Sequence, residues 1–211
     1  TVDHSTANTA SITPGADQLV IVAVGQRRGV DGTTAPTLSG NGLTYVQINS
    51  VQHQARRRIS LFRAMGASPS AGAINIDYAG ATQKSSTWSV YQFGSVDTTG
   101  TNGSGAVVQS ATNAATTTSL TITLAAFGAG NGATSSFNIS NAEAVANEAG
   151  WTEIHDVAAG AQAVETQWRD DEDTTPSGSW ATSDPSGGIA IEVKATAAAA
   201  EVDNSFTMMA F

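Results

Sequence analysis

Apolar residues recur at every second position along this chain, and this period limits its fold more than any other feature. Segments 74–78, 120–124 and 189–193 show the alternation most clearly. Because side chains of a β-strand point alternately to its two faces, each segment is predicted to be a strand with one face on a core and one in water. Helical periodicity is nearly absent. Segment 140–149 is expected to form one or two turns at most, and 195–200 is too short for a stable isolated helix.

Two other segments are predicted to lie at the centre of a sheet. Leu19–Val24 is apolar without interruption, and 88–93 carries aromatic residues on both sides. Such strands are usually covered on both faces. Weaker strand candidates are 44–51, 59–65, 106–109, 152–157, 164–168 and 206–211, separated by turn-forming Gly, Asn and Pro.

The number and spacing of these strands predict an all-β, jelly-roll-like sandwich of two antiparallel sheets with about ten strands and little helix. Seven strands would suffice for an immunoglobulin-like domain, and a jelly roll hides more sheet edges. The domain is expected to span 12–195, preceded by a polar arm, 1–11, and followed by a C-terminal arm or added strand, 196–211. Two smaller sandwiches are the alternative, although 98–106 is the only candidate linker between them.

The two halves of the domain, 12–100 and 106–195, carry similar elements in the same order. The proposed counterparts lie about a hundred residues apart. Segment 19–24 corresponds to 120–124, and segment 88–93 corresponds to 189–193. Between them, Gly42-Leu43-Thr44 corresponds to Gly150-Trp151-Thr152, each opening a strand, and Phe62-Arg63 corresponds to Trp168-Arg169. Few identities support the correspondence. It therefore indicates either a remote duplication or the regular spacing of a sandwich.

Charge and composition exclude several classes of protein. The chain has 9 basic and 18 acidic residues and a formal net charge of −9, so nucleic acid is not an expected partner. It has no cysteine, which excludes disulfides and thiol chemistry. No apolar stretch is long enough for a transmembrane helix, and the first residues lack the pattern of a signal peptide, so no membrane association is expected.

No constellation of residues typical of an enzyme is present. His4, His53 and His155 stand alone, without zinc-binding spacing, and are expected at the surface. Phosphate-binding loops, nucleophile elbows and dinucleotide fingerprints are missing. The acidic run 170–173 has the oxygen ligands that calcium prefers, but consecutive side chains in an extended chain point apart, which favours a solvated loop tip. We therefore predict no catalytic residues, no metal and no cofactor.

Two groups of residues are predicted to contact a partner. On a strand, Arg56 and Arg58 would share one face and Arg57 the other, which suits ion pairs with an acidic surface. The alternative is a charged edge strand that blocks aggregation. The apolar residues near the end of the sequence would be an aggregation hazard in water, so they are expected to pack on their own domain or on a neighbouring subunit. They are Phe206, Met208, Met209 and Phe211.

Tryptophan offers another kind of site. Trp151 and Trp168 would form a stacking platform for sugar rings if they were exposed, whereas Trp88 is expected to fill a core.

Several of these motifs together resemble the β-sandwich domains of tailed-phage virion proteins and related bacterial surface proteins. The resemblance covers residues 12–195 and rests on turn glycines and core positions. The matching segments are the apolar strand after Pro14-Gly15, Gly42-Leu43-Thr44-Tyr45, Leu61-Phe62-Arg63-Ala64, Phe93-Gly94-Ser95-Val96-Asp97-Thr98-Thr99, Gly150-Trp151-Thr152-Glu153 and 188–194.

The resemblance implies a structural protein of the virion surface. Domains of this kind decorate capsids or build tails and fibres, usually as trimers, and no catalytic residues come with the pattern. The expected function is therefore that of a homotrimeric capsid decoration protein that binds the major capsid protein at subunit junctions. The alternative is a carbohydrate-binding module of a tail fibre or of an extracellular, cell-surface protein.

Overall fold

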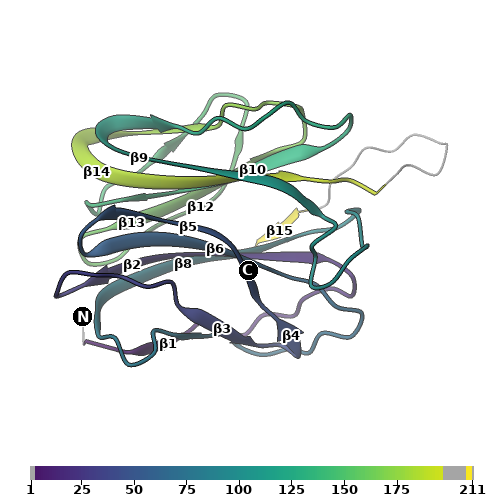
Figure 1. The fold of residues 1–211 in the computed structure, drawn as a ribbon, viewed down its shortest axis with the longest axis horizontal. Coiled ribbons are helices and arrows are strands. Elements are labelled where there is room, and N and C mark those ends of the chain that lie inside the picture. The colour runs from purple at the N-terminus through teal and green to yellow at the C-terminus, as the bar shows by residue number, and fades with distance from the viewer. Residues whose placement is uncertain (1–2, 197–207, 211) are drawn as a thin grey trace.

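The computed structural model describes residues 3–196 and 208–210, which form three antiparallel sheets stacked in layers (Figure 1). The prediction of an all-β chain is confirmed, since no helix occurs among the described residues. Two details differ from expectation: there are three sheets instead of two, and fifteen strands are described instead of about ten. Segment 140–149 holds the short strand β11 (Ala146–Asn147) in place of the expected helical turns. The described residues thus include no helix that would be long and apolar enough to cross a membrane.

The first half of the chain builds the lower sheet and all of the middle sheet except β15, and the second half builds the upper sheet. The lower sheet has the order β1 (Thr6–Asn8), β7 (Asn75–Asp77), β3 (Thr37–Gly40) and β4 (Leu43–Thr44). The middle sheet has the order β15 (Met208–Ala210), β8 (Gln83–Phe93), β2 (Leu19–Arg28), β6 (Arg57–Ala64) and β5 (Val46–Gln54). The upper sheet has the order β11, β14 (Ser177–Val193), β10 (Gly132–Ile139), β13 (Ala163–Arg169) and β12 (Thr152–Ala158), with β9 (Val107–Thr121) paired to β14.

The middle sheet is covered on both faces, as the apolar run 19–24 predicted. Leu19, Ile21 and Ala23 of β2 pack in the core between the middle and upper sheets, here called the upper core. The intervening residues Val20, Val22 and Val24 pack in the core between the middle and lower sheets, here called the lower core. Because one strand supplies alternate side chains to two cores, it has no room for a polar face.

A third core lies on the outer face of the upper sheet. It contains Leu120, Ile122, Leu124, Phe137, Ile139 and Trp180. The chain after β9 covers this face, and the backbone N–H of Ile122 donates to Pro176 O at 2.9 Å. Segment 189–193 is consequently buried on both faces, with Glu192 only 1% exposed, so the prediction that one of its faces lies in water is wrong.

The middle and upper sheets share one strand order. In the first half of the chain the order is β5-β6-β2-β8, and in the second half it is β12-β13-β10-β14. The stacking is also reciprocal, since β8 contacts β12 and β13 while β14 contacts β5 and β6. The topological counterpart of β2 is therefore β10, and not segment 120–124 as the sequence pattern indicated. The candidate linker 98–106 is the stretch through which the chain passes from the middle sheet to the upper one.

Candidate functional site

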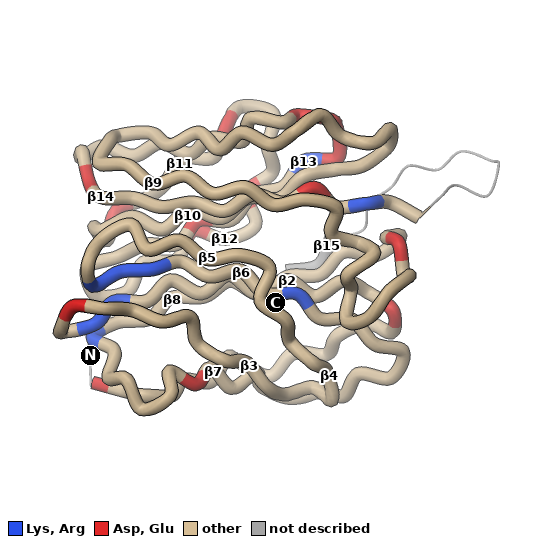
Figure 2. Tube along the Cα trace, in the orientation of Figure 1, with Lys and Arg blue, Asp and Glu red and all other residues tan. Residues whose placement is uncertain are grey.

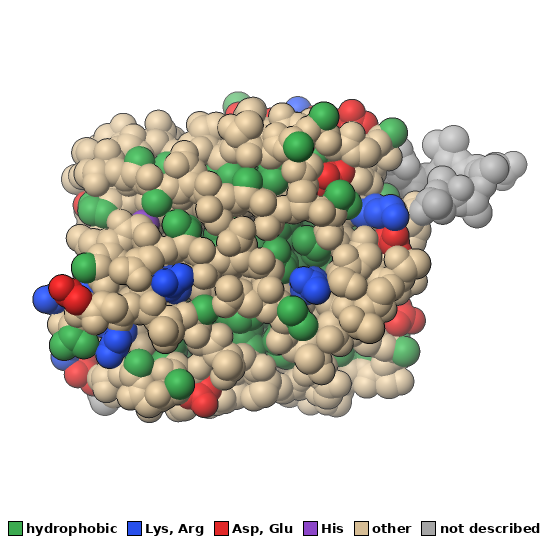
Figure 3. Space-filling model, in the orientation of Figure 1, with side chains coloured by type: hydrophobic (Ala, Val, Ile, Leu, Met, Phe, Trp, Pro, Cys, Tyr) green, Lys and Arg blue, Asp and Glu red, His purple; other side chains and the backbone are tan. Residues whose placement is uncertain are grey.

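Six of the nine Lys and Arg residues gather at one end of the middle sheet (Figure 2). They are Arg27, Arg28, Arg56, Arg57, Arg58 and Lys84, here called the basic end. Strand β2 finishes where β6 and β8 begin, so Arg27 lies opposite both Arg57 and Ser85 in the sheet register. The pairing of strands thus joins three basic groups that are far apart in the sequence. Figure 3 shows basic side chains at this end and a mostly uncharged polar face beside them.

The three consecutive arginines do not share the geometry expected of a single strand. Arg56 lies in the turn between β5 and β6, and its Nε contacts Asp31 Oδ1 at 2.7 Å. Arg57 is 7% exposed and reaches toward the upper layer, where its Nη1 donates to Ala161 O at 2.5 Å. Strand β6 lies between β2 and β5, so these residues do not protect a sheet edge, and that alternative is not supported.

Positive charge at the basic end is only partly neutralised by carboxylates. Arg56 pairs with Asp31 and Lys84 with Asp3, each at 2.7 Å, and both pairs are exposed to solvent. Exposed pairs of this kind contribute little to stability, about 0–1 kcal/mol. Arg58 donates to neutral oxygens, including Ser50 Oγ at 2.8 Å.

Burial shapes the electrostatics of Arg57. Loss of hydration and the neighbouring Arg27 charge lower the pKa of Arg57 to about 10, and the Asp184 charge opposes part of this shift. The guanidinium therefore remains charged at neutral pH. A pocket of about 320 Å³ opens beside it, lined by Arg27, Asp31, Gln54, Ala55, Arg56 and Arg57. An anionic group placed there would relieve the repulsion between Arg27 and Arg57, which makes the basic end a candidate binding surface.

All three histidines were expected at the surface, but His53 and His155 form contacts between the middle and upper sheets. His53 Nε2 lies 3.0 Å from Asn138 Oδ1 across the upper core. Burial, with Arg57 and Arg58 nearby, lowers the pKa of His53 to about 4, so this ring is neutral at pH 7. His155 Nδ1 lies 2.8 Å from Ser89 Oγ, but that hydroxyl is 1% exposed and also bonds Thr166. This serine–histidine pair links β8 to β12 and presents no open nucleophile.

The candidate glycan platform is not formed. Trp151 is 4% exposed, and its Nε1 donates to Asp173 Oδ2 at 3.1 Å. Trp168 packs edge-on against Phe93 with ring centroids 6.2 Å apart. Both rings are therefore engaged in packing within the domain.

Residues 170–172 of the acidic run 170–173 are exposed, and two residues of the run pair with Arg169. Arg169 pairs with Asp171 at 2.5 Å and with Asp173 at 3.3 Å. Across the described residues, no group of three or more His, Cys, Asp or Glu side chains is placed to hold a metal ion.

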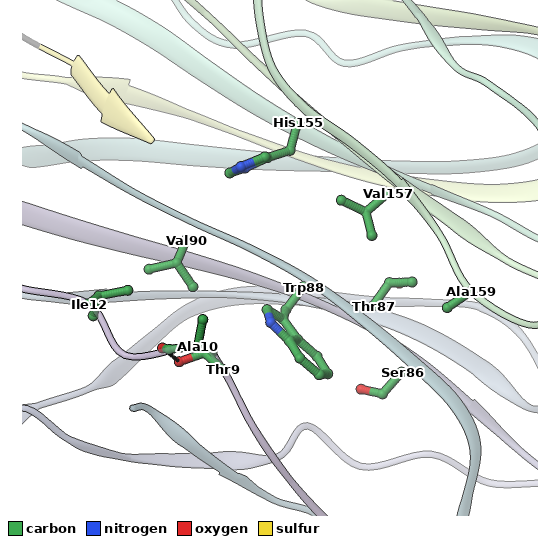
Figure 4. A pocket seen from close by; sticks show the side chains of 10 residues that line it. All are labelled: Thr9, Ala10, Ile12, Ser86, Thr87, Trp88, Val90, His155, Val157 and Ala159. Atoms are coloured by element: carbon green, nitrogen blue, oxygen red, sulfur yellow. Dashed lines mark hydrogen bonds between the residues drawn. The ribbon is translucent and has the colours of Figure 1, made fainter. Parts of the chain in front are cut away.

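A pocket lined by no Lys, Arg, Asp or Glu, which the sequence did not reveal, lies where β8 and β12 meet the N-terminal segment 9–12 (Figure 4). Its volume is about 350 Å³. Trp88 and Val90 of β8 form its floor, His155 and Val157 of β12 one wall, and the N-terminal segment 9–12 the other. Trp88 thus has one face in a pocket, although it also packs against the lower core as expected.

The apolar C-terminal residues fall partly outside the described residues. The backbone of Met208, Met209 and Ala210 forms β15, which pairs antiparallel with Phe93, Gln92 and Tyr91 of β8, so the expected added strand is present here. Phe206 and Phe211 lie outside the described residues.

Comparison with family models, with curated proteins and with solved structures found no match for this chain.

Proposed function

We propose that this chain is a non-catalytic assembly protein that attaches to an acidic protein surface through its basic end. The observation that carries the proposal is the concentration of six basic residues at one end of a chain whose net charge is −9. Such an uneven distribution orients a protein as it approaches a partner, because the partner's negative surface attracts one end and repels the rest. The stacked sheets give the basic end a rigid support.

The specific form that we favour is a capsid decoration protein on the outside of a phage head, acting as a homotrimer. This form rests on the resemblance to virion sandwich domains described above, and the acidic outer surface of a shell would be the partner of the basic end. Several weak contacts per trimer would add up to firm attachment. Each occupied junction would then stabilise the shell by the free energy of binding.

The carbohydrate-binding alternative receives less support from the geometry. Its expected platform residues, Trp151 and Trp168, pack inside the domain. The remaining candidate is the pocket beside Trp88.

The basic end is tested with a pair of charge-matched double variants. Arg27→Gln/Arg56→Gln removes two charges at the basic end, while Arg63→Gln/Lys194→Gln removes two elsewhere. Immobilised polyglutamate serves as the acidic probe, with binding measured at several salt concentrations. We expect the first variant to lose affinity by about tenfold or more and the second to stay near wild type.

Two outcomes would contradict the proposal. One is an equal loss in both double variants, which would show that net charge alone matters. The other is tighter binding to duplex DNA than to polyglutamate at the same salt concentration, which would point to a nucleic-acid partner.

A further inference from the structure

We propose that the pocket beside Trp88 is a strand-addition site, in which the C-terminal segment of a second copy of this chain pairs with the open edge of β8. The inference is independent of the basic end and of the partner proposed for it.

The floor of the pocket is an unpaired sheet edge. Strand β8 pairs along one side with β2 from Gln83 to Phe93. On its other side, β15 covers Tyr91–Phe93 and an isolated bridge joins His4 to Gln83. Between these contacts, the described backbone offers residues 84–90 no partner other than β2. An open edge in a recess is where an added strand finds ready hydrogen-bonding groups.

The second half of the molecule shows what fills the equivalent edge. Strand β14 is the counterpart of β8 in the shared strand order, and its outer edge is covered by β9, which pairs with it from Ser177 to Val193. The first half has no strand corresponding to β9 among the described residues. The pocket therefore occupies the position that a covering strand takes in the other sheet.

The chemistry of the pocket identifies the occupant. No Lys, Arg, Asp or Glu lines it. Its larger apolar side chains are Trp88, Val90, Ile12 and Val157, with the His155 ring and hydroxyl groups beside them. It thus suits an uncharged, largely apolar segment in extended form. Segment 205–211 of this chain, Ser-Phe-Thr-Met-Met-Ala-Phe, has this composition.

Residues 208–210 of this segment already pair with this edge. Strand β15 runs antiparallel to β8, with Ala210 opposite Tyr91, next to the pocket (Figure 4). A second copy would add its own segment in the same direction along residues 84–90. Main-chain hydrogen bonds would provide the affinity, and the apolar walls would select side chains.

The test uses the full chain and a fluorescently labelled peptide with the sequence of residues 205–211. Val157→Asp places a charge on one wall and Ala10→Asp a charge on the other. Both positions are exposed, so the fold tolerates either change. The matched control is Val108→Asp, because Val108 is 51% exposed on β9 and lies away from the pocket. Fluorescence anisotropy measures peptide binding, and sedimentation velocity measures self-association of the chain.

We expect saturable peptide binding and concentration-dependent self-association by wild type and Val108→Asp. Both should weaken at least tenfold in Val157→Asp and in Ala10→Asp. The inference is overturned if the peptide does not bind, if a scrambled peptide binds equally well, or if both wall variants self-associate like wild type. Binding of oligosaccharides in place of the peptide would also overturn it and would favour the carbohydrate reading. None of these results depends on polyglutamate binding, so failure here leaves the basic end untouched.

Discussion

The carboxyl group of Glu165 is fully buried on the outer side of β13, opposite Asp156 in the register with β12. Neither of its oxygens has a hydrogen-bond partner among the described residues. Burial, together with the charges of Glu153 and Asp156, raises the pKa of Glu165 well above 4.5. A buried carboxyl group in such a place favours the neutral form, because the ion would lose its hydration without compensation.

The raised pKa of Glu165 predicts that the contribution of this group to stability falls as pH rises. Between pH 4.5 and the pKa of Glu165 in the folded state, this carboxyl group binds more protons in the folded chain than in the unfolded chain, so its contribution to stability falls as pH increases through this window. Glu165→Gln removes the cost of ionisation. We expect it to raise the free energy of unfolding by about 1–3 kcal/mol at pH 8 and to change it little at pH 4.

Urea denaturation at both pH values measures this effect. Glu172→Gln is the control, since Glu172 is exposed and the same change there should alter stability at neither pH. A stabilisation by Glu165→Gln that is equal at pH 4 and pH 8 would show that ionisation is not its cause.

At the scale of the elements, β10 shows how a central strand escapes detection. All of its residues are buried, but its sequence, Gly-Ala-Thr-Ser-Ser-Phe-Asn-Ile, has no regular apolar alternation. Two of its polar side chains bond inside the protein: Thr134 Oγ1 lies 2.9 Å from Tyr91 Oη, and Asn138 Nδ2 donates to Ala163 O at 2.8 Å. Their partners come from neighbouring strands and sheets, so no local pattern could reveal them.

The close approach of β2 to the upper sheet gives a prediction for Gly25. A Cβ atom at this position would lie 2.5 Å from Val164 Cγ2 and 2.8 Å from Asn138 Nδ2. Gly25→Ala should therefore destabilise the protein by about 1–3 kcal/mol, because the two layers would have to separate. Thermal unfolding followed by circular dichroism measures the loss.

Gly29→Ala is the matched control for Gly25→Ala. A Cβ at Gly29 would meet the Lys84 side chain, whose Cε atom lies 2.9 Å away and can move. If both variants unfold at the same temperature, the two layers are not as tightly packed at Gly25 as the structure shows.

On the scale of the whole molecule, the middle sheet couples the other two. Strands β2, β6 and β8 place alternate side chains in the upper and lower cores. The two halves also meet at their ends, where Lys194 Nζ contacts Asp97 Oδ2 at 2.6 Å. Neither outer sheet can therefore lose its packing without exposing one face of the middle sheet.

This coupling predicts a single cooperative unfolding transition. Ile76→Val in the lower core and Ile191→Val in the upper core should each shift the same transition, with a loss of about 0.5–1.5 kcal/mol. Differential scanning calorimetry provides the measurement. Two separate heat-absorption peaks, with each variant moving only one of them, would show that the layers unfold independently.

The sequence by itself determined that the chain is all-β and where most strands lie. Alternating residues such as Ile74 and Ile76 report the period of a strand directly, and the uninterrupted run 19–24 reported burial on both faces. These properties depend on neighbours along the chain, so they can be inferred without coordinates.

Only the tertiary structure decided the number of sheets, the site of the basic end and the existence of the pocket. The register of β2 with β6 brings Arg27 to Arg57, and the recess beside Trp88 forms where β8, β12 and the N-terminal segment 9–12 come together. Strand β10 was hidden because buried polar residues such as Thr134 and Asn138 bond to residues of other strands. Each of these features arises from pairings between distant segments, and the free energy that selects such pairings comes from packing and hydrogen bonding across layers, which local periodicity does not encode.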